Sequence, residues 1–81
     1  MKTEDELLER IVVNPKIMGG KPIVRGTRIT VEQVLKMLAQ GLATPGILRD
    51  YPHFSKDDVA AVLFYAAKVA GEEEIFPVTV T

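Results

Sequence analysis

The chain has 81 residues, a formal net charge of −1, no cysteine, and His53 as its single histidine. This length allows one domain. The composition excludes disulfides and thiolate metal sites and argues against a histidine metal cluster, so we expect no cofactor.

A chain of this size has a thin core, because it buries only about 60–65% of the surface that its unfolded form exposes. Small domains of this kind often gain stability from a partner, and we therefore expect a homodimer. No apolar run approaches the roughly 20 residues that span a bilayer, and the acidic N-terminus has no apolar signal core. We expect a cytoplasmic protein with no membrane association.

The formal charge is unevenly distributed along the chain. Residues 1–9 carry −3, residues 10–56 carry +6 and residues 57–81 carry −4. A basic centre between acidic ends indicates an anionic partner for the centre. The alternative is that these charges mix and cancel on the folded surface.

Residues 10–29 are predicted to be extended. A short β-branched run is followed by an Asn-Pro pair, which forms turns. Gly19, Gly20 and Gly26 then permit left-handed backbone and sharp bends. We predict two or three short strands in a hairpin.

Three helices are predicted after the hairpin, at about residues 30–41, 44–50 and 55–71. Thr30 and Gln33 are spaced to form a capping box at the start of the first. The second begins at a Thr-Pro pair, and the third begins at a capping serine. The predicted fold class is mainly α, an N-terminal β-hairpin followed by a three-helix, helix-turn-helix bundle.

The helix at 55–71 is predicted to be apolar on two sides. Its core side is expected to carry Val59, Val62, Leu63, Ala66 and Ala70. The other side is mostly alanine and aromatic, and a helix that is apolar all round is buried on all sides. We therefore predict a protein interface at Ala60, Ala61, Phe64, Tyr65, Ala67 and Lys68. Alternatively, the N-terminal segment folds back through Leu7 and Leu8 and covers this side.

The predicted organisation is an acidic extension at 1–9, one domain at 10–71 and a tail at 72–81. In the tail, Phe76, Val78 and Val80 alternate with polar or proline positions. This pattern suits a strand added to the edge of a partner's sheet, and these three residues join the predicted interface. The alternative is a frayed terminus.

The stretch from Arg10 to Val31 closely resembles the opening of the family known as domain of unknown function 433. The Gly-Lys-Pro step and the Gly-Thr-Arg-Ile entry into the first helix carry the likeness, as does the later segment 51–59. It covers about residues 10–71. The resemblance implies a homeodomain-like helix-turn-helix with a hairpin arm, and an antitoxin of the VapB group partnered with a PIN-like ribonuclease.

Two groups of basic residues are the candidate DNA-binding residues. The hairpin group is Lys16, Lys21, Arg25 and Arg28, and the group around the last interhelical turn is Arg49, His53 and Lys56. Basic arms of this kind contact phosphates or enter a groove. For Arg28 we favour a structural role, in which Arg28 and Thr27 lock the hairpin to the first helix.

A catalytic site is not expected, because no nucleophile and orienting group accompany His53. We also expect no metal and no small-molecule substrate. The leading hypothesis is an antitoxin that neutralises a PIN-like ribonuclease toxin and binds DNA as an autorepressor. The alternatives are a structural or interaction dimer without nucleic-acid binding, and a DNA-binding regulator with no toxin partner.

Overall fold

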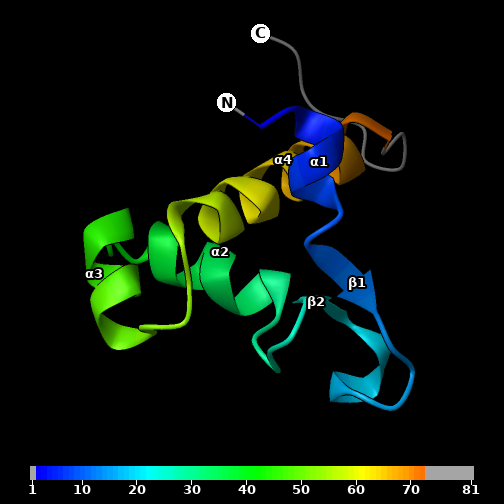
Figure 1. Cartoon of the computed structure of the whole chain (residues 1–81), viewed down its shortest axis with the longest axis horizontal. Coiled ribbons are helices and arrows are strands. Elements are labelled where there is room, and N and C mark those ends of the chain that lie inside the picture. The colour runs from blue at the N-terminus through cyan, green and yellow to red at the C-terminus, as the bar shows by residue number, and fades with distance from the viewer. Residues whose placement is uncertain (1, 73–81) are drawn as a thin grey trace, which may run out of the picture.

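The computed structural model describes residues 2–72 and shows a hairpin followed by helices (Figure 1). The elements are α1 (Glu4–Leu8), β1 (Ile11–Val13), a 3₁₀ turn (Met18–Gly20), β2 (Pro22–Val24), α2 (Val31–Ala39), α3 (Thr44–Asp50) and α4 (Lys56–Glu72). The predicted fold class, mainly helical with an N-terminal hairpin, is confirmed. Helix α1 was not predicted.

The hairpin has two antiparallel strands in the described part of the chain, with Ile11 opposite Val24. The third extended segment forms only an isolated bridge between Ile23 and Thr30. Gly26 has φ 80°, as its predicted role in a bend requires. The chain therefore leaves β2 through a tight turn and enters α2 directly.

Capping side chains set where α2 and α4 begin. The Gln33 N–H donates to Thr30 Oγ1 at 3.0 Å, but the Gln33 side chain donates to the Tyr51 hydroxyl at 3.2 Å. Only half of the predicted capping box therefore forms, because a tertiary partner takes the glutamine amide. At α4 the exchange is reciprocal: the Ser55 N–H donates to Asp58 Oδ2 at 2.9 Å, and the Asp58 N–H donates to Ser55 Oγ at 3.3 Å.

The core lies where α2, α3 and α4 meet strand β2. Its buried members are Val24, Val31, Val34, Ile47, Phe54, Val59 and Val62. Figure 1 shows α2 alongside α4, with α3 at one end of the molecule and the hairpin at the other. Each such side chain contributes about 1.5–3 kcal/mol through burial, so this small cluster holds the helices and the hairpin together.

Helix α1 packs on α4 (Figure 1). Leu7 is buried outside the main cluster, as is Ala61 of α4, while Leu8 is half-buried. Thr3 and Glu6 form a capping box that starts α1. The N-terminal segment therefore folds back onto the last helix, as the alternative expectation had it, and it covers part of the surface of α4.

Candidate functional site

The four basic residues predicted on the hairpin are all exposed: Lys16, Lys21, Arg25 and Arg28. Lys21 forms an ion pair with Glu32 of α2, with 3.0 Å between Nζ and Oε1. The other three have no ion-pair partner within residues 2–72. Three guanidinium or ammonium groups on this small hairpin therefore face solvent with their charge unneutralised by the described chain.

The structural role favoured for Arg28 is wrong, because its side chain is exposed and donates no hydrogen bond within the described residues. Its neighbour Thr27 holds the turn. Thr27 Oγ1 donates to the Val24 carbonyl at 2.7 Å and accepts from the Ile29 N–H at 3.0 Å. A short hydroxyl reaches the local backbone, which leaves the long guanidinium free to project outward.

The second basic group divides between two surfaces. Arg49, His53 and Lys56 are all exposed. His53 lines the same groove as Arg28, a hollow of about 410 Å³ between the turn after β2 and the α3–α4 link. Lys56 lines a different groove, between α3 and α4. The fold therefore brings His53 and Arg28 together and leaves Lys56 apart from them.

The acidic start of α4 is neutralised by residues that flank α1. Arg10 Nη1 lies 3.0 Å from Asp58 Oδ1, and Lys2 Nζ lies 2.6 Å from Asp57 Oδ2. The hydrogen bond from Lys2 holds the pKa of Asp57 below its ordinary value. The charge pattern of the sequence did not predict these pairs, which join residues 48 and 55 positions apart.

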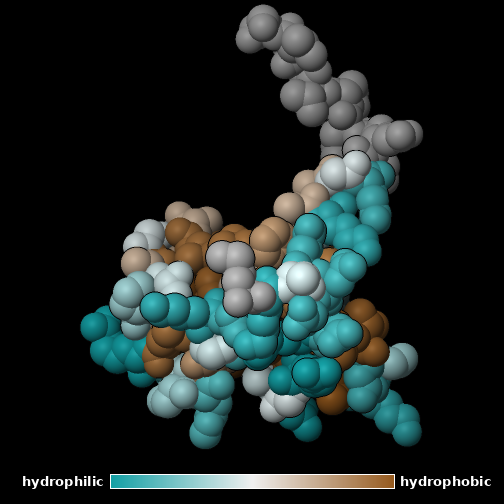
Figure 2. All heavy atoms as spheres, turned by 45° about the horizontal axis from the view of Figure 1, so that its top comes forward, coloured by the Kyte–Doolittle hydropathy of each residue, from teal (hydrophilic) through white to brown (hydrophobic). Residues whose placement is uncertain are grey.

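Helix α4 leaves a large apolar surface uncovered. Leu63 is 49% exposed, Val69 43% and Phe64 38%. Figure 2 shows brown, apolar residues reaching the surface between hydrophilic ones on the displayed face. Isolated exposed apolar residues are normal, but three on one helix indicate an interaction surface. They lie on different sides of α4, because Leu63 lines a groove toward α3 and Val69 lines a groove toward α2.

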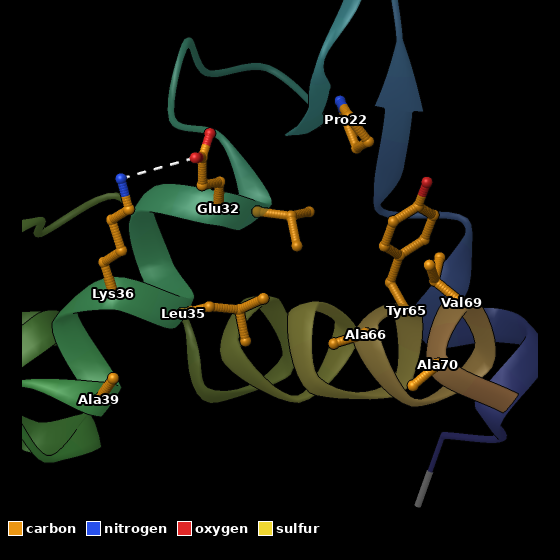
Figure 3. Close-up of a pocket in the computed structure, with 10 residues that line it drawn as sticks. Pro22, Glu32, Leu35, Lys36, Ala39, Tyr65, Ala66, Val69 and Ala70 are labelled. Atoms are coloured by element: carbon orange, nitrogen blue, oxygen red, sulfur yellow. Dashed lines mark ion pairs between the residues drawn. The ribbon is translucent and has the colours of Figure 1, made fainter. Parts of the chain in front are cut away.

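Two grooves flank this surface. The first, of about 550 Å³, lies between α2 and α4; in Figure 3 the Tyr65 ring and Pro22 stand at one end and Leu35 faces Ala66 across it. The Glu32–Lys36 ion pair, 3.5 Å long, lies at its polar rim. The second groove, of about 440 Å³, lies between α3 and α4. It is lined by Thr44, Pro45, Leu48, Lys56, Val59, Ala60 and Leu63.

The residues of the predicted interface on α4 differ in their exposure. Phe64, Ala67 and Lys68 are exposed, whereas Ala60 is half-buried. Ala61 is fully buried, so its assignment to the interface is wrong; α1 packs on α4 and both contribute to this second buried region. Phe76, Val78 and Val80 lie outside the described residues.

Tyr65 is half-buried and packs against the chain's own core. Conversely, Leu63 and Ala70 were predicted on the core side and are exposed. Helix α4 has 17 residues and α2 has 9. At 1.5 Å per residue, α4 is about 12 Å longer than α2, so α2 cannot cover α4 over its whole length.

Within residues 2–72, no three histidine, cysteine or acidic side chains are grouped as metal ligands would be. None of the helices there combines the length and the hydropathy required to cross a bilayer.

These features define a small, mainly helical domain with a hairpin arm, cationic turns and an apolar helix face. The sequence model of the family described as "Protein of unknown function (DUF433)" matches residues 11–66. The chain belongs to the DUF433 family, as its motifs predicted.

Relatives of the chain support this membership. Uncharacterized protein y4eO of Sinorhizobium fredii is 33% identical over 58 residues, which are 72% of this chain and 26% of that protein. An uncharacterized protein of Archaeoglobus fulgidus is 56% identical over 25 residues, 31% of this chain and 69% of that protein. The chain thus spans about a quarter of the length of y4eO.

A solved structure shares the fold. The crystal structure of a DUF433 member from Anabaena variabilis superposes with a TM-score of 0.74 at 26% sequence identity. The match covers 84% of this chain and 67% of that one. The arrangement of hairpin and helices is therefore common to both proteins.

Proposed function

We propose that this chain is a non-catalytic binding protein of the antitoxin type. In this account it forms a homodimer in the cytoplasm, neutralises a PIN-like ribonuclease toxin and binds DNA as an autorepressor, with α3 and α4 as its helix-turn-helix. One observation carries the proposal. Helix α4 presents Leu63, Phe64 and Val69 to solvent on a chain whose own core is small.

The second copy fits best on the stripe formed by Ala60, Leu63, Phe64 and Ala67. These positions follow the i, i+3, i+4, i+7 spacing of one helix face. Small alanines let two helices approach closely, and the leucine and phenylalanine supply contact area. A stripe of this kind is complementary to itself, as a two-fold interface requires.

The toxin fits best in the groove between α2 and α4 (Figure 3), on the other side of α4 from Leu63. Val69, Ala66 and Leu35 form an apolar floor with the Glu32–Lys36 pair at its edge. An apolar centre with a charged rim is the usual anatomy of a protein interface. Because the dimer stripe and the toxin groove are on different sides of α4, the dimer could bind its toxin without dissociating.

DNA binding is supported by Lys16, Arg25 and Arg28, which are exposed and have no ion-pair partner within residues 2–72. Lys21 is a weaker candidate because Glu32 holds it. The acidic residues at the start of α4 disfavour this helix as a reader of bases. We therefore assign phosphate contact to the hairpin and its following turn.

The second candidate is an interaction dimer without nucleic-acid binding. It is favoured by the same apolar stripe on α4 and needs none of the exposed cations. The third, a regulator without a toxin, needs the cations but not the α2–α4 groove. The three candidates therefore differ in which surface is required.

Co-purification with the product of the adjacent gene tests the antitoxin function. We expect a stable complex, lost on Val69→Ser together with Leu35→Ser and retained in Lys16→Ala, an exposed change on the hairpin outside the groove. If no complex forms with the wild-type chain, the antitoxin function is wrong.

A fluorescence anisotropy titration with duplex DNA from upstream of the gene tests the repressor function. We expect affinity to fall steeply between two salt concentrations because bound cations release counterions. Lys16→Ala with Arg25→Ala should reduce the salt slope by about 2, one per lost phosphate contact. Lys68→Ala removes one charge elsewhere and should leave the slope unchanged. Absence of binding at low salt would leave the interaction dimer as the better account.

A further inference from the structure

The groove between the turn after β2 and the α3–α4 link combines cationic, aromatic and acidic side chains. Its lining is Gly26, Thr27, Arg28, Ile29, Asp50, Tyr51, Pro52, His53 and Phe54. Two segments more than twenty positions apart thus form its walls. In Figure 1 both segments lie on the side of the molecule away from α1. At about 410 Å³, the groove falls within the size range of small-ligand sites.

Hydrogen bonds fix the first wall. The Thr27 N–H donates to the Val24 carbonyl at 3.0 Å, and the Val24 N–H donates to the Ile29 carbonyl at 3.0 Å. The Thr27 hydroxyl adds the bond to Val24 described above. Arg28 therefore projects from a turn whose backbone is already ordered, which reduces the entropy that a ligand must overcome on binding.

The second wall is equally held in place. The Tyr51 and Phe54 ring centroids are 5.9 Å apart with an interplanar angle of 40°. The Phe54 N–H donates to the Tyr51 carbonyl at 2.9 Å, and Gln33 donates to the Tyr51 hydroxyl. Phe54 is buried in the core. The half-buried Tyr51 is therefore anchored both through its ring and through its hydroxyl.

The exposed side chains of the groove suit a flat, polar, aromatic ligand. Arg28 offers a planar guanidinium and His53 a planar imidazole, and both surfaces stack on nucleobases. Asp50 at the rim is exposed and has no ion-pair partner within residues 2–72. A carboxylate accepts hydrogen bonds from exocyclic amino groups such as cytosine N4.

A paired base in a duplex presents only its edge, whereas the Arg28 guanidinium and the His53 imidazole that line this groove are types of group that stack on the face of a ring. The face of a base is accessible when the base is unpaired. Arg25 precedes the first wall directly and is exposed, so it is placed for a phosphate beside the base.

We propose that this groove binds an unpaired base of single-stranded nucleic acid, with Arg28 and His53 stacking on the base and Asp50 accepting from its amino group. The inference rests on the proposed nucleic-acid function and adds an unpaired base to the duplex phosphates that the hairpin is proposed to contact. Single-stranded DNA and RNA share this chemistry.

The test is a fluorescence anisotropy titration of the full chain with short labelled mixed-sequence DNA and RNA strands, the matching DNA duplex, and a strand with abasic positions. We expect at least one single strand to bind more tightly than both the duplex and its abasic counterpart, which keeps the phosphates and lacks the bases. The stronger of the two strands identifies the source. Equal affinity for the abasic strand would overturn the inference.

Substitutions separate stacking from charge. Arg28→Lys keeps the positive charge and removes the planar fork, and it should weaken single-strand binding about fivefold or more, with the loss persisting at high salt. His53→Ala should weaken binding similarly, whereas His53→Phe retains a flat ring and should bind nearly as the wild type does. Both positions are exposed, so folding is preserved.

The outcomes distinguish the two proposals. If the duplex binds at least as well as the single strands and Arg28→Lys has no effect, the base groove is wrong and DNA binding by the hairpin stands. If neither duplex nor single strand binds at low salt, both the groove and the nucleic-acid part of the proposed function are wrong.

Discussion

The two halves of α4 differ in what surrounds them. Within residues 56–62, Asp58, Val59, Ala61 and Val62 are buried. Within residues 63–72, no side chain is buried and three large apolar ones are exposed. The first half is capped by Ser55, paired with Arg10 and packed against the core, whereas the second half lines an open groove beside α2.

This difference separates stability from recognition along one helix. Changes in the first half should alter the free energy of unfolding of the single chain. Changes in the second half should alter its association with partners.

The largest effect is expected for Asp58→Ala. This carboxylate receives the Ser55 N–H and lies 3.0 Å from Arg10 Nη1, so its removal loses a cap and the shorter of the two ion pairs of Arg10, whose Nη2 keeps Asp57 Oδ2 at 3.6 Å. The free energy of unfolding should fall by about 3 kcal/mol, the sum of a lost cap and a lost charged hydrogen bond, measured by urea denaturation. Asp57→Ala is the matched control, and its exposed pair with Lys2 should cost less. Equal losses would contradict a special role for Asp58.

Val62→Ala and Phe64→Ala compare how much the two halves of α4 contribute to the free energy of unfolding. Val62 is fully buried and Phe64 is 38% exposed. Removing two buried methyl groups should lower the free energy of unfolding by about 2 kcal/mol. Phe64→Ala should lower it by less than about 1 kcal/mol when measured on the monomer. A larger loss for Phe64→Ala would show that its ring packs into the chain's own interior.

The smallest effect concerns acid. A hydrogen bond from Lys2 lowers the pKa of Asp57, and one from Lys21 lowers the pKa of Glu32. A carboxyl group with a lowered pKa in the folded state contributes stability above its unfolded pKa, near 4, and loses it as pH falls through the folded value. Both groups are exposed, so this contribution is small.

Lys2→Met and Lys21→Met should therefore flatten the fall in unfolding free energy below about pH 4, measured by urea denaturation across a pH series. High salt should produce a similar flattening in the wild type because it screens exposed pairs. If the lysine variants keep the full acid response, the two ion pairs do not contribute to it.

Local signals in the sequence located most of the fold. Thr30 and the capping serine predicted where α2 and α4 begin, and the Gly26 bend was predicted from the glycine alone. Helix α1 was missed, although Thr3 and Glu6 have the spacing of a capping box. A helix of five residues is not stable alone, so α1 depends on the packing of Leu7 against α4. A tertiary contact of this kind cannot be predicted from the local sequence pattern.

The binding surfaces were predicted less well, for physical reasons. A helical wheel gives the direction in which each side chain points but not which other element lies there. It therefore placed Leu63 in the core and Ala61 at the interface, whereas Leu63 is exposed and Ala61 is buried. Similarly, the sequence could not show that Thr27 satisfies the turn and leaves Arg28 exposed. The groove that joins Arg28 to His53 depends on how α3 packs, which only the assembled core determines.

Sedimentation velocity of the full chain over a range of concentrations tests the central claim, that the second half of α4 is a partner-binding surface, most directly. We predict a dimer at micromolar concentration for the wild type. Leu63→Ser with Phe64→Ser should give a monomer whose far-ultraviolet circular dichroism is unchanged. A wild-type chain that stays monomeric at every concentration would contradict the claim.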